Sequence, residues 1–361
     1  MRPVTRPTVL EICAGGGGQA LGLEAAGFAH AAAIEIDKAA CETLRANRPR
    51  WTVVEADVCT IDGADYAGVD LLAGGVPCPP FSVAGKQLGK DDERDMFPVA
   101  LEIARKAKPR AVLLENVPGF ASAKFTEYRD DVLAQLTRMG YSADWRVLNA
   151  CDFGVPQLRP RFILVALREE YADAFEWPKP LGTVAAVGPA LADLMGANGW
   201  PGTEAWVERA KGIAPTVVGG SKKHGGPDLG PTRARAAWAT LGVDGLGIAD
   251  DAPWRDFPAD KSPRLTVRMV ARVQGFKDEW LFSGRKTAAY RQVGNAFPPP
   301  VAEAVGRSIY AALTGRAPPP VEPPPDGPEP SPTNGGTDDA QPETRCLRCA
   351  VACDRRPIWL H

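Results

Sequence analysis

The stretch EICAGGGGQALGLEAAGF, residues 11–28, decides the fold class. An apolar run typical of a strand leads into four consecutive glycines and then into apolar residues at helical spacing. Glycines let the backbone approach a ligand closely, and the first turn of the following helix offers unpaired N–H groups to an anion. The stretch therefore predicts a strand, a ligand-binding turn and a helix that open an α/β domain.

The same alternation continues to residue 168. We expect strands at residues 8–15, 30–37, 51–58, 69–77, 110–117, 143–153 and 161–168, and helices at residues 19–28, 38–48, 97–108 and 126–141. This order predicts a doubly wound α/β domain with a mostly parallel sheet. Ligands of such sheets bind at the carboxyl ends of the strands, so these ends are where functional residues are expected.

Composition narrows the class of protein. The chain has 361 residues, of which 45% are hydrophobic and 24% charged, with a net charge of −2. No apolar run approaches the roughly 20 residues that span a bilayer, and the N-terminus enters a strand directly, so we expect no membrane partner and no signal peptide. The first five of the eight cysteines show no paired spacing, which favours reduced thiols and a cytoplasmic location.

The composition and the periodicity of the sequence change near residue 178. Residues 178–263 are rich in Gly, Pro and Trp, which indicates a second, less regular domain, and helical patterns resume at residues 265–276 and 298–315. The acidic, proline-rich sequence that follows predicts a disordered tail. Its final C-x2-C-x3-C spacing and His361 could complete a zinc site. Because no fold elements surround them, we expect an unstructured appendage and no metal.

Three strand ends suit a single nucleoside. Gly15–Gly18 allow close backbone approach, Glu35 can accept both hydroxyls of a ribose, and Asp57 can accept an adenine amino group. A tight structural turn with two surface acids would look the same when each feature is taken alone. The spacing does not distinguish a dinucleotide from an S-adenosyl compound.

A second cluster surrounds the sequence GGVPCPPFS, residues 74–82. Its Cys78 lies in a loop stiffened by prolines and could be a nucleophile, a metal ligand or a small hydrophobe. The sequence ENV places Glu115 at the end of the next strand, and QLRPR places Arg159 and Arg161 at the start of a later one. Together they could add a thiolate to an electron-poor ring while an acid contacts a ring nitrogen and an arginine an exocyclic oxygen.

Five motifs follow the glycine turn in order: GGVPCPPFS, ENV, QLRPR, LTVRMVARVQGF and YRQVGNAFPPPVAEAVG. In this order they resemble the cytosine-C5 DNA methyltransferases, over roughly residues 8–313. The resemblance implies a Rossmann-like methyltransferase fold with a smaller irregular target-recognition domain. It also implies transfer of a methyl group from S-adenosyl-L-methionine to C5 of a cytosine flipped out of double-stranded DNA.

The resemblance further implies an organisation and partners. We expect a catalytic and cofactor-binding domain at residues 1–177, a target-recognition domain at 178–284, a return segment at 285–316 and the tail at 317–361. We expect a monomer, associated with the nucleoid through DNA. It would be either a solitary enzyme or the modification half of a restriction system whose endonuclease acts on the same site.

In this family the cysteine of the proline-cysteine loop attacks C6 of the cytosine, which implies that Cys78 is the nucleophile. Glu115 would contact N3 and the exocyclic amine, Arg161 would hold O2, and Arg159 would support the pair. The cofactor-binding residues implied are Cys13, Ala14, Gly15, Gly17, Gly18, Glu35, Ile36, Asp57, Val58, Pro77 and Asn295. Ile36 can pack on the adenine face. The family usually has an aromatic residue where this chain has Cys13, and Asp where it has Glu11.

DNA contacts are expected from two regions. A loop at residues 82–93 resembles the mobile loop that closes over DNA, with Lys86 and Gln87 near phosphates or bases. The middle segment carries fifteen Lys and Arg against ten Asp and Glu between residues 204 and 291. Its predicted contacts are Thr216, Lys222, Lys223, Arg233 and Arg235, with His224 in the same basic patch and Val217 beside Thr216. An ordinary solvated loop is the alternative.

Three other functions fit parts of the sequence. An RNA cytosine methyltransferase would use the same scaffold. A nicotinamide-dependent oxidoreductase would explain the glycine turn and Glu35 but leaves Cys78, Glu115 and Arg161 without a role. A DNA-binding module without activity is disfavoured because all the chemical residues are present. His30 begins a strand and is expected to be packed or at the surface, without a catalytic role.

Overall fold

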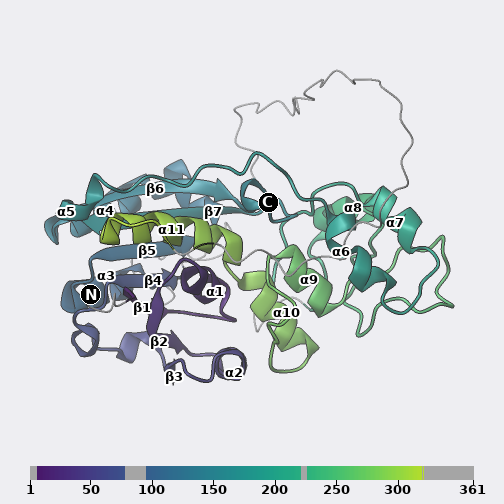
Figure 1. The fold of residues 1–361 in the computed structure, drawn as a ribbon, viewed down its shortest axis with the longest axis horizontal. Coiled ribbons are helices and arrows are strands. Elements are labelled where there is room, and N and C mark those ends of the chain that lie inside the picture. Colours follow the sequence, from purple (N-terminus) through teal and green to yellow (C-terminus); the bar gives the residue numbers. More distant parts are fainter. Residues whose placement is uncertain (1–5, 78–94, 221–225, 319, 321–361) are drawn as a thin grey trace, which may run out of the picture. The chain divides into compact units, whose positions relative to one another are not determined.

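The computed structural model describes residues 6–77, 95–220, 226–318 and 320. Within them, strands form a single sheet of order β3-β2-β1-β4-β5-β7-β6 (Figure 1). The strands are β1 Thr8–Ile12, β2 Ala29–Glu35, β3 Val53–Glu55, β4 Leu71–Gly75, β5 Ala111–Asn116, β6 Tyr141–Asn149 and β7 Pro160–Arg168. Strands β1 to β5 are parallel, which confirms the predicted doubly wound, mostly parallel sheet.

The order of the strands reverses between β1 and β4. The chain runs outward from β1 to β2 and β3, and then returns to place β4 on the other side of β1. At such a switch point the loops at the carboxyl ends diverge and leave a crevice for a ligand. The glycine turn follows β1 and Pro77 follows β4, so both lie at this crevice.

Strand β7 runs antiparallel to β5, with Glu115 opposite Ile163 and Asn116 opposite Phe162. The first residues of β7 therefore lie at the same sheet edge as the last residues of β5. This reversal brings the QLRPR sequence to the carboxyl edge of the parallel strands, although it precedes its own strand.

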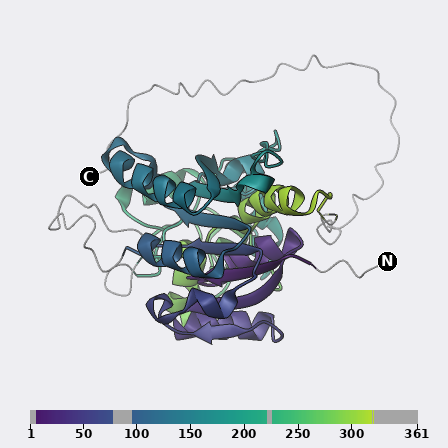
Figure 2. The ribbon, with the colours of Figure 1, turned by 90° about the vertical axis from the view of Figure 1, so that its left-hand side faces the viewer.

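Helices cover both faces of the sheet (Figure 2). Alternate residues of β1 show the two faces: Val9 packs with the residues of α1 and α11, whereas Leu10 packs with those of α3 and α4. The helices are α1 Gly18–Ala25, α2 Lys38–Asn47, α3 Phe97–Ala107, α4 Thr126–Arg138, α5 Glu169–Ala172, α6 Val187–Gly196, α7 Thr203–Arg209, α8 Thr232–Thr240, α9 Val267–Val273, α10 Lys286–Asn295 and α11 Pro299–Thr314.

Several predicted strands end earlier than expected. Strand β6 stops at Asn149, and residues 150–153 form a 3-10 turn instead. Strand β3 covers only residues 53–55, because Asp57 accepts a hydrogen bond from the Cys59 N–H and starts another 3-10 turn. In both places a short turn replaces the last residues of an apolar run.

The middle segment consists of helices and irregular backbone. Its described residues form isolated bridges but no ladder of paired strands. The buried side chains of Trp200, Trp206 and Trp238 belong to the same hydrophobic cluster as α9 and Ala14 of the glycine turn. The middle segment therefore shares its core with the cofactor-side turn.

Some predictions concern residues that the structure does not describe. Cys78, Lys86, Gln87, Lys222, Lys223 and His224 lie outside the described residues, as does the tail apart from residues 317, 318 and 320. In the described part of the chain, no helix has the length and apolarity needed to cross a membrane.

Candidate active site

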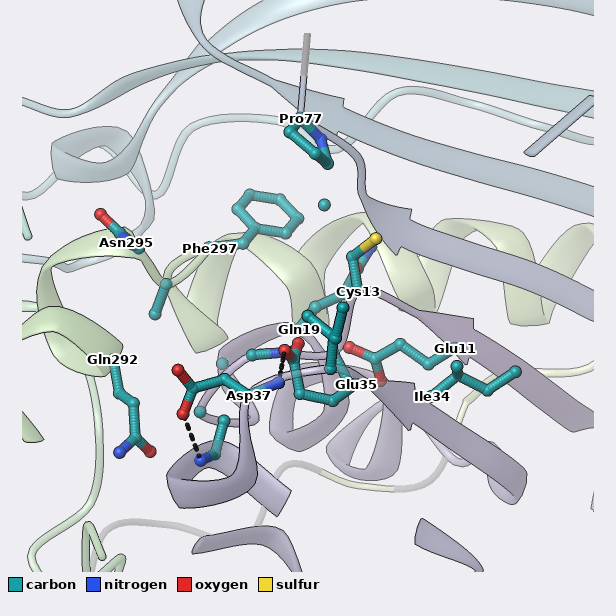
Figure 3. Close-up of a pocket in the computed structure, with 18 of the residues that line it drawn as sticks. Glu11, Cys13, Gln19, Ile34, Glu35, Asp37, Pro77, Gln292, Asn295 and Phe297 are labelled. Atoms are coloured by element: carbon teal, nitrogen blue, oxygen red, sulfur yellow. Dashed lines mark hydrogen bonds between the residues drawn. The ribbon is translucent and has the colours of Figure 1, made fainter. Parts of the chain in front are cut away.

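A cavity of about 740 Å³ opens at the carboxyl ends of β1, β2 and β4 (Figure 3). It brings together residues from seven separate stretches of the chain, including α10 near the C-terminal end of the fold. Ten of the predicted cofactor residues line it: Cys13, Ala14, Gly15, Gly18, Glu35, Ile36, Asp57, Val58, Pro77 and Asn295. The eleventh, Gly17, is not among the lining residues.

Gly17 has a structural reason to be glycine. Its φ is +88°, and an added Cβ would lie 2.5 Å from Cζ2 of Trp280. The Trp280 indole N–H also donates to the Gly16 carbonyl at 2.9 Å. Gly17 therefore lets the turn pack against Trp280, and its direct contact with a cofactor stays a prediction.

Glu35 is held by the glycine turn itself. Its Oε2 accepts from the Gly15 N–H and its Oε1 from the Asp37 N–H, both at 2.7 Å. A carboxylate has about four lone-pair sites, so each oxygen can still accept from a ribose hydroxyl. The two backbone bonds fix the direction in which those remaining sites point.

Apolar side chains line the cavity beside Glu35 and Asp57. Ile36 lines the cavity and is 65% exposed, which is unusual for a large aliphatic side chain. Val58 is buried, and Asp57 next to it is exposed, with Oδ1 accepting from the Cys59 N–H at 2.9 Å. This end of the cavity offers a flat ring an apolar contact and a carboxylate edge.

Cys13 takes the place of the family's usual aromatic residue. Burial, together with the negative charge of Glu35, raises the pKa of its thiol to about 12. The thiol therefore stays protonated at neutral pH, and it contributes packing surface to the cavity rather than a nucleophile.

Glu115 and Arg161 form an ion pair at the edge of the same cavity. Arg161 Nε lies 2.8 Å from Glu115 Oε1, and each side chain is 10% exposed. Burial raises the pKa of Glu115, while the guanidiniums of Arg161 and Arg159 lower it in part. A second nitrogen of Arg161, Nη1, donates to the Pro160 carbonyl at 2.8 Å. Both the acid and the cation are thus fixed before any substrate arrives.

The hydrogen bonds of Arg159 go to backbone carbonyls. Its guanidinium donates to three carbonyls, those of Val217 at 2.5 Å, Gly294 at 2.8 Å and Ala296 at 2.9 Å. The side chain is 1% exposed. Arg159 therefore joins the middle segment to the end of α10. Its charge also lowers the pKa of Glu115, and its support of the Glu115–Arg161 pair stays a prediction.

Gln157 of the same motif strengthens this junction. Its Oε1 accepts from the Val217 N–H at 2.8 Å, and its Nε2 donates to Gln274 Oε1 at 2.6 Å. The hydroxyl of Thr216 donates to the Leu158 carbonyl at 2.5 Å. Thr216 therefore helps to attach the middle segment, and its contact with DNA stays a prediction.

The two predicted arginines of α8 remain at the surface. Arg233 is exposed, and Arg235 is half-buried, with its Nη2 3.4 Å from the Thr232 hydroxyl. His30, expected to be packed or at the surface, is packed: its side chain stacks on Trp51 with ring centroids 4.0 Å apart.

Asn116 of the ENV motif is a positioning residue that was not predicted from the sequence. Asn116 Nδ2 donates to the Val76 carbonyl at 2.9 Å, directly before Pro77. The Met96 N–H donates to the Pro77 carbonyl at 3.2 Å. Together these bonds secure the two ends of the chain that flank residues 78–94. The ENV motif could have indicated this role of Asn116, but the sequence-based prediction assigned a function only to Glu115.

Comparison with known proteins agrees with this geometry. A family model described as C-5 cytosine-specific DNA methylase matches residues 7–311. The chain belongs to this family. The methylase is 59% identical to the Type II methyltransferase M.NaeI of Lentzea aerocolonigenes over 312 residues, 84% of this chain and 75% of the relative. It is 53% identical to the Type II methyltransferase M.NgoMIV of Neisseria gonorrhoeae over 310 residues, 85% and 98% of the two chains.

Solved structures share the fold of the methylase. A mutant of Spodoptera frugiperda DNMT2 superposes with a TM-score of 0.60 at 17% identity, covering 84% of this chain and 99% of that one. The S. pombe Dnmt2 methyltransferase gives 0.58 at 18% identity, covering 86% and 100%. The family assignment confirms a DNA (cytosine-5-)-methyltransferase that uses S-adenosyl-L-methionine.

Proposed function

We propose that this methylase is the modification enzyme of a type II restriction-modification system, acting as a monomer on one specific duplex site. The proposal is supported by the printed names of its two relatives at 59% and 53% identity, both Type II methyltransferases. A cognate endonuclease that cuts the same site when it is unmethylated would be its functional partner. The enzyme would work in the cytoplasm, on the DNA of the nucleoid.

The residues of the cavity fit S-adenosyl-L-methionine. Glu35 is oriented for ribose hydroxyls by its bonds to the Gly15 and Asp37 N–H groups, and the exposed Ile36 and the carboxylate of Asp57 suit an adenine ring. Pro77 and Asn295 line the opposite part of the cavity. When bound, this cofactor supplies an electrophilic methyl group.

We propose that Cys78 is the nucleophile, as the family resemblance implies. Its thiolate would form a bond to C6 of the cytosine, and the displaced electron pair would make C5 nucleophilic. Glu115, whose pKa is raised by burial, can supply a proton or hydrogen bond at N3, where negative charge develops. After C5 is methylated, loss of the C5 proton to a base and release of the thiolate restore the aromatic ring and free the enzyme.

The observation that carries this proposal is the Glu115–Arg161 ion pair. Arg161 can hold the cytosine O2 while its Nε keeps Glu115 in place at 2.8 Å. Glu115 lines the cavity together with Pro77, which immediately precedes Cys78. An acid and a cation of this kind, beside the cofactor cavity, match the polar edge of a pyrimidine and have no use in hydride transfer.

DNA contact is proposed for the middle segment. Arg233 and Arg235 on α8 offer cations for phosphates or base edges, and Lys86, Gln87, Lys222 and Lys223 remain sequence-based proposals. Thr216 would act indirectly, by fixing the segment that leads to residues 221–225. The proposed domains are residues 1–177, 178–284 and 285–316, with a tail at 317–361.

Bisulfite sequencing of a plasmid from cells that express the chain tests the proposed function. We expect protected cytosines at one position of one recurring sequence, and none in cells that express the Cys78→Ser variant. Transfer of methyl groups to transfer RNA but not to duplex DNA would contradict a DNA substrate. Protection scattered over unrelated sequences would contradict a site-specific modification enzyme.

A further inference from the structure

A histidine and a glutamate form an enclosed pair at the wall of the cofactor cavity. His30 Nε2 lies 3.2 Å from Glu11 Oε2, and both side chains are 0% exposed. Glu11 is one of the residues that line the cavity, and Figure 3 shows it in the region of Cys13 and Glu35. Neither Glu11 nor His30 takes part in the methyl transfer proposed above, so the pair is a buried titratable group without an assigned role.

The two residues can share one acidic proton. In the described part of the chain, neither Glu11 Oε1 nor His30 Nδ1 has a hydrogen-bond partner, so the contact between the two side chains is their main polar interaction. With the proton on either residue, the pair has no net charge. When the proton is lost, a negative charge remains on Glu11 beside a neutral imidazole. Groups that interact this closely titrate as a unit.

The surroundings on the cavity side favour the neutral pair. Burial raises the pKa of Glu11, His30 and the Ala20 N–H lower it, and the negative charge of Glu35 raises it, with a net increase above the ordinary value of 4.5. Cys13 adds no charge near neutral pH, because the pKa of its thiol is about 12. The pair therefore keeps its proton to a higher pH than an exposed glutamate would.

Behind His30 lie an aromatic ring and an ion pair. The imidazole stacks on Trp51 with ring centroids 4.0 Å apart. The Arg48 guanidinium lies 5.8 Å from the centroid of the Trp51 ring, and its Nη2 lies 2.7 Å from Glu24 Oε2. The positive charge on this side is thus already matched by a carboxylate. A charge that enters the cavity is what can change the state of the pair.

The methyl donor brings such a charge and the product does not. S-adenosyl-L-methionine carries a sulfonium in addition to the opposite charges of its amino-acid end, so it is a cation near neutral pH. S-adenosylhomocysteine has a neutral thioether in place of the sulfonium. A nearby cation stabilises a buried carboxylate and favours loss of its proton.

We propose that the Glu11–His30 pair responds to the charge of the cofactor: it loses one proton to solvent when S-adenosyl-L-methionine binds and keeps it when S-adenosylhomocysteine binds. The negative charge left on Glu11 then compensates the sulfonium. The enzyme would prefer the methyl donor to the product more strongly as the pH rises. The proposal rests on binding of the cofactor in this cavity.

Calorimetric binding of both ligands to the full chain, at a series of pH values, tests the proposal. We expect the ratio of the Kd of S-adenosylhomocysteine to that of S-adenosyl-L-methionine to rise about tenfold as the pH increases through the raised pKa of Glu11. The ammonium and carboxylate are common to both ligands, so their titration cancels in this ratio. Near the midpoint, S-adenosyl-L-methionine should release more protons, which titrations in buffers of different ionisation enthalpy measure. Equal proton release with both ligands at every pH would overturn the proposal without the need for a variant.

Three variants assign the proton. Glu11→Gln keeps the shape of the side chain but cannot ionise, so its Kd ratio should not change with pH. Asp57→Asn is the matched control, because it removes an exposed carboxylate of the same cavity and should keep the pH dependence. His30→Gln should move the midpoint to higher pH, because His30 lowers the pKa of Glu11.

A structural role alone would give a different result. If the Kd ratio of Glu11→Gln rises with pH as it does in the unaltered chain, the pair only supports the fold and the proposal is wrong. The ratio decides this even where the variant has a lower Tm or binds both ligands more weakly by one factor. If the unaltered chain binds neither ligand, the cofactor assignment itself fails.

Discussion

Arg161 and Glu115 face each other across the antiparallel strands β5 and β7, with Arg161 Nε 2.8 Å from Glu115 Oε1. The pair forms because β7 reverses direction and starts where β5 ends. It is almost enclosed by protein, so the acid and the cation keep fixed positions beside the cavity. A substrate ring at this edge would therefore meet a preorganised proton donor and a preorganised cation.

Glu115→Gln should lower kcat for DNA methylation by about a hundredfold to ten-thousandfold, because an amide cannot transfer a proton to N3. The amide oxygen can still accept from Arg161, so the site should keep its shape. Transfer of radiolabelled methyl groups to a duplex substrate measures the effect, and calorimetric binding of S-adenosylhomocysteine serves as the control. A kcat close to that of the unaltered enzyme would rule out proton donation by Glu115.

The difference in unfolding free energy between the unaltered chain and Glu115→Gln should depend on pH. Burial raises the pKa of Glu115 in the folded chain above its ordinary value of 4.5, so the folded state holds this proton at higher pH than the unfolded state. The contribution of Glu115 to stability is fully present below pH 4.5. It decreases as the pH rises from there through the raised pKa.

The unfolding free energy of the unaltered chain should therefore fall relative to that of Glu115→Gln across this window. Urea unfolding of both proteins at a series of pH values measures the difference. An increase in the relative stability of the unaltered chain with pH would mean that attraction to Arg161 outweighs the burial of the carboxylate.

Arg159→Lys should mainly lower stability and Arg161→Lys should mainly lower kcat, although only one residue separates the two positions. An ammonium cannot span the carbonyls of Val217, Gly294 and Ala296, so Arg159→Lys should reduce the free energy of unfolding by about 2–4 kcal/mol. Arg161→Lys keeps a positive charge beside Glu115 and should affect kcat more than Tm. Equal loss of stability in the two variants would contradict these separate roles.

Cys78→Ser should abolish methylation and leave binding of S-adenosylhomocysteine largely intact. A serine hydroxyl is not ionised near neutral pH and is a far weaker nucleophile than a thiolate. Single-turnover methyl transfer, with calorimetry in parallel, measures the two properties. Near-normal turnover of this variant would mean that the proposed attack on C6 is wrong.

Removal of residues 317–361 should leave methylation of a duplex substrate unchanged. Helix α11 ends at Thr314, and the family model matches only as far as residue 311, so the deletion begins beyond both. The truncated and full chains can be compared by kcat/KM on the same DNA. Complete loss of activity would assign the tail a function that its composition does not suggest.

Much of the cofactor site could be predicted from local sequence. Glu35 ends β2 and Asp57 follows β3, and the carboxyl ends of neighbouring parallel strands share one edge of the sheet whatever the details of packing. The glycine turn and Ile36 follow from the same reasoning. The position of Arg161 could also be expected, because its strand opens at that edge.

The hydrogen bonding of Arg159, Thr216 and Gln19 could not be predicted in this way. The family resemblance implied that Arg159 supports the Glu115–Arg161 pair, but it did not imply that the guanidinium reaches carbonyls up to 137 residues away in the sequence. The Thr216 hydroxyl donates to the Leu158 carbonyl, and neither polar atom of the buried Gln19 side chain has a hydrogen-bond partner among the described residues. Each of these properties depends on which distant backbone lies within hydrogen-bonding distance.

The sequence by itself therefore determined the fold class, the family, and the set of chemical groups at the sheet edge. These follow from periodicity and from the order of the motifs, which are properties of neighbouring residues. Only the tertiary structure decided that Arg161 forms an ion pair with Glu115 and that Arg159 holds the middle segment to α10. The reason is that hydrogen bonds and burial depend on contacts between segments that are distant in the chain, and no local pattern encodes them.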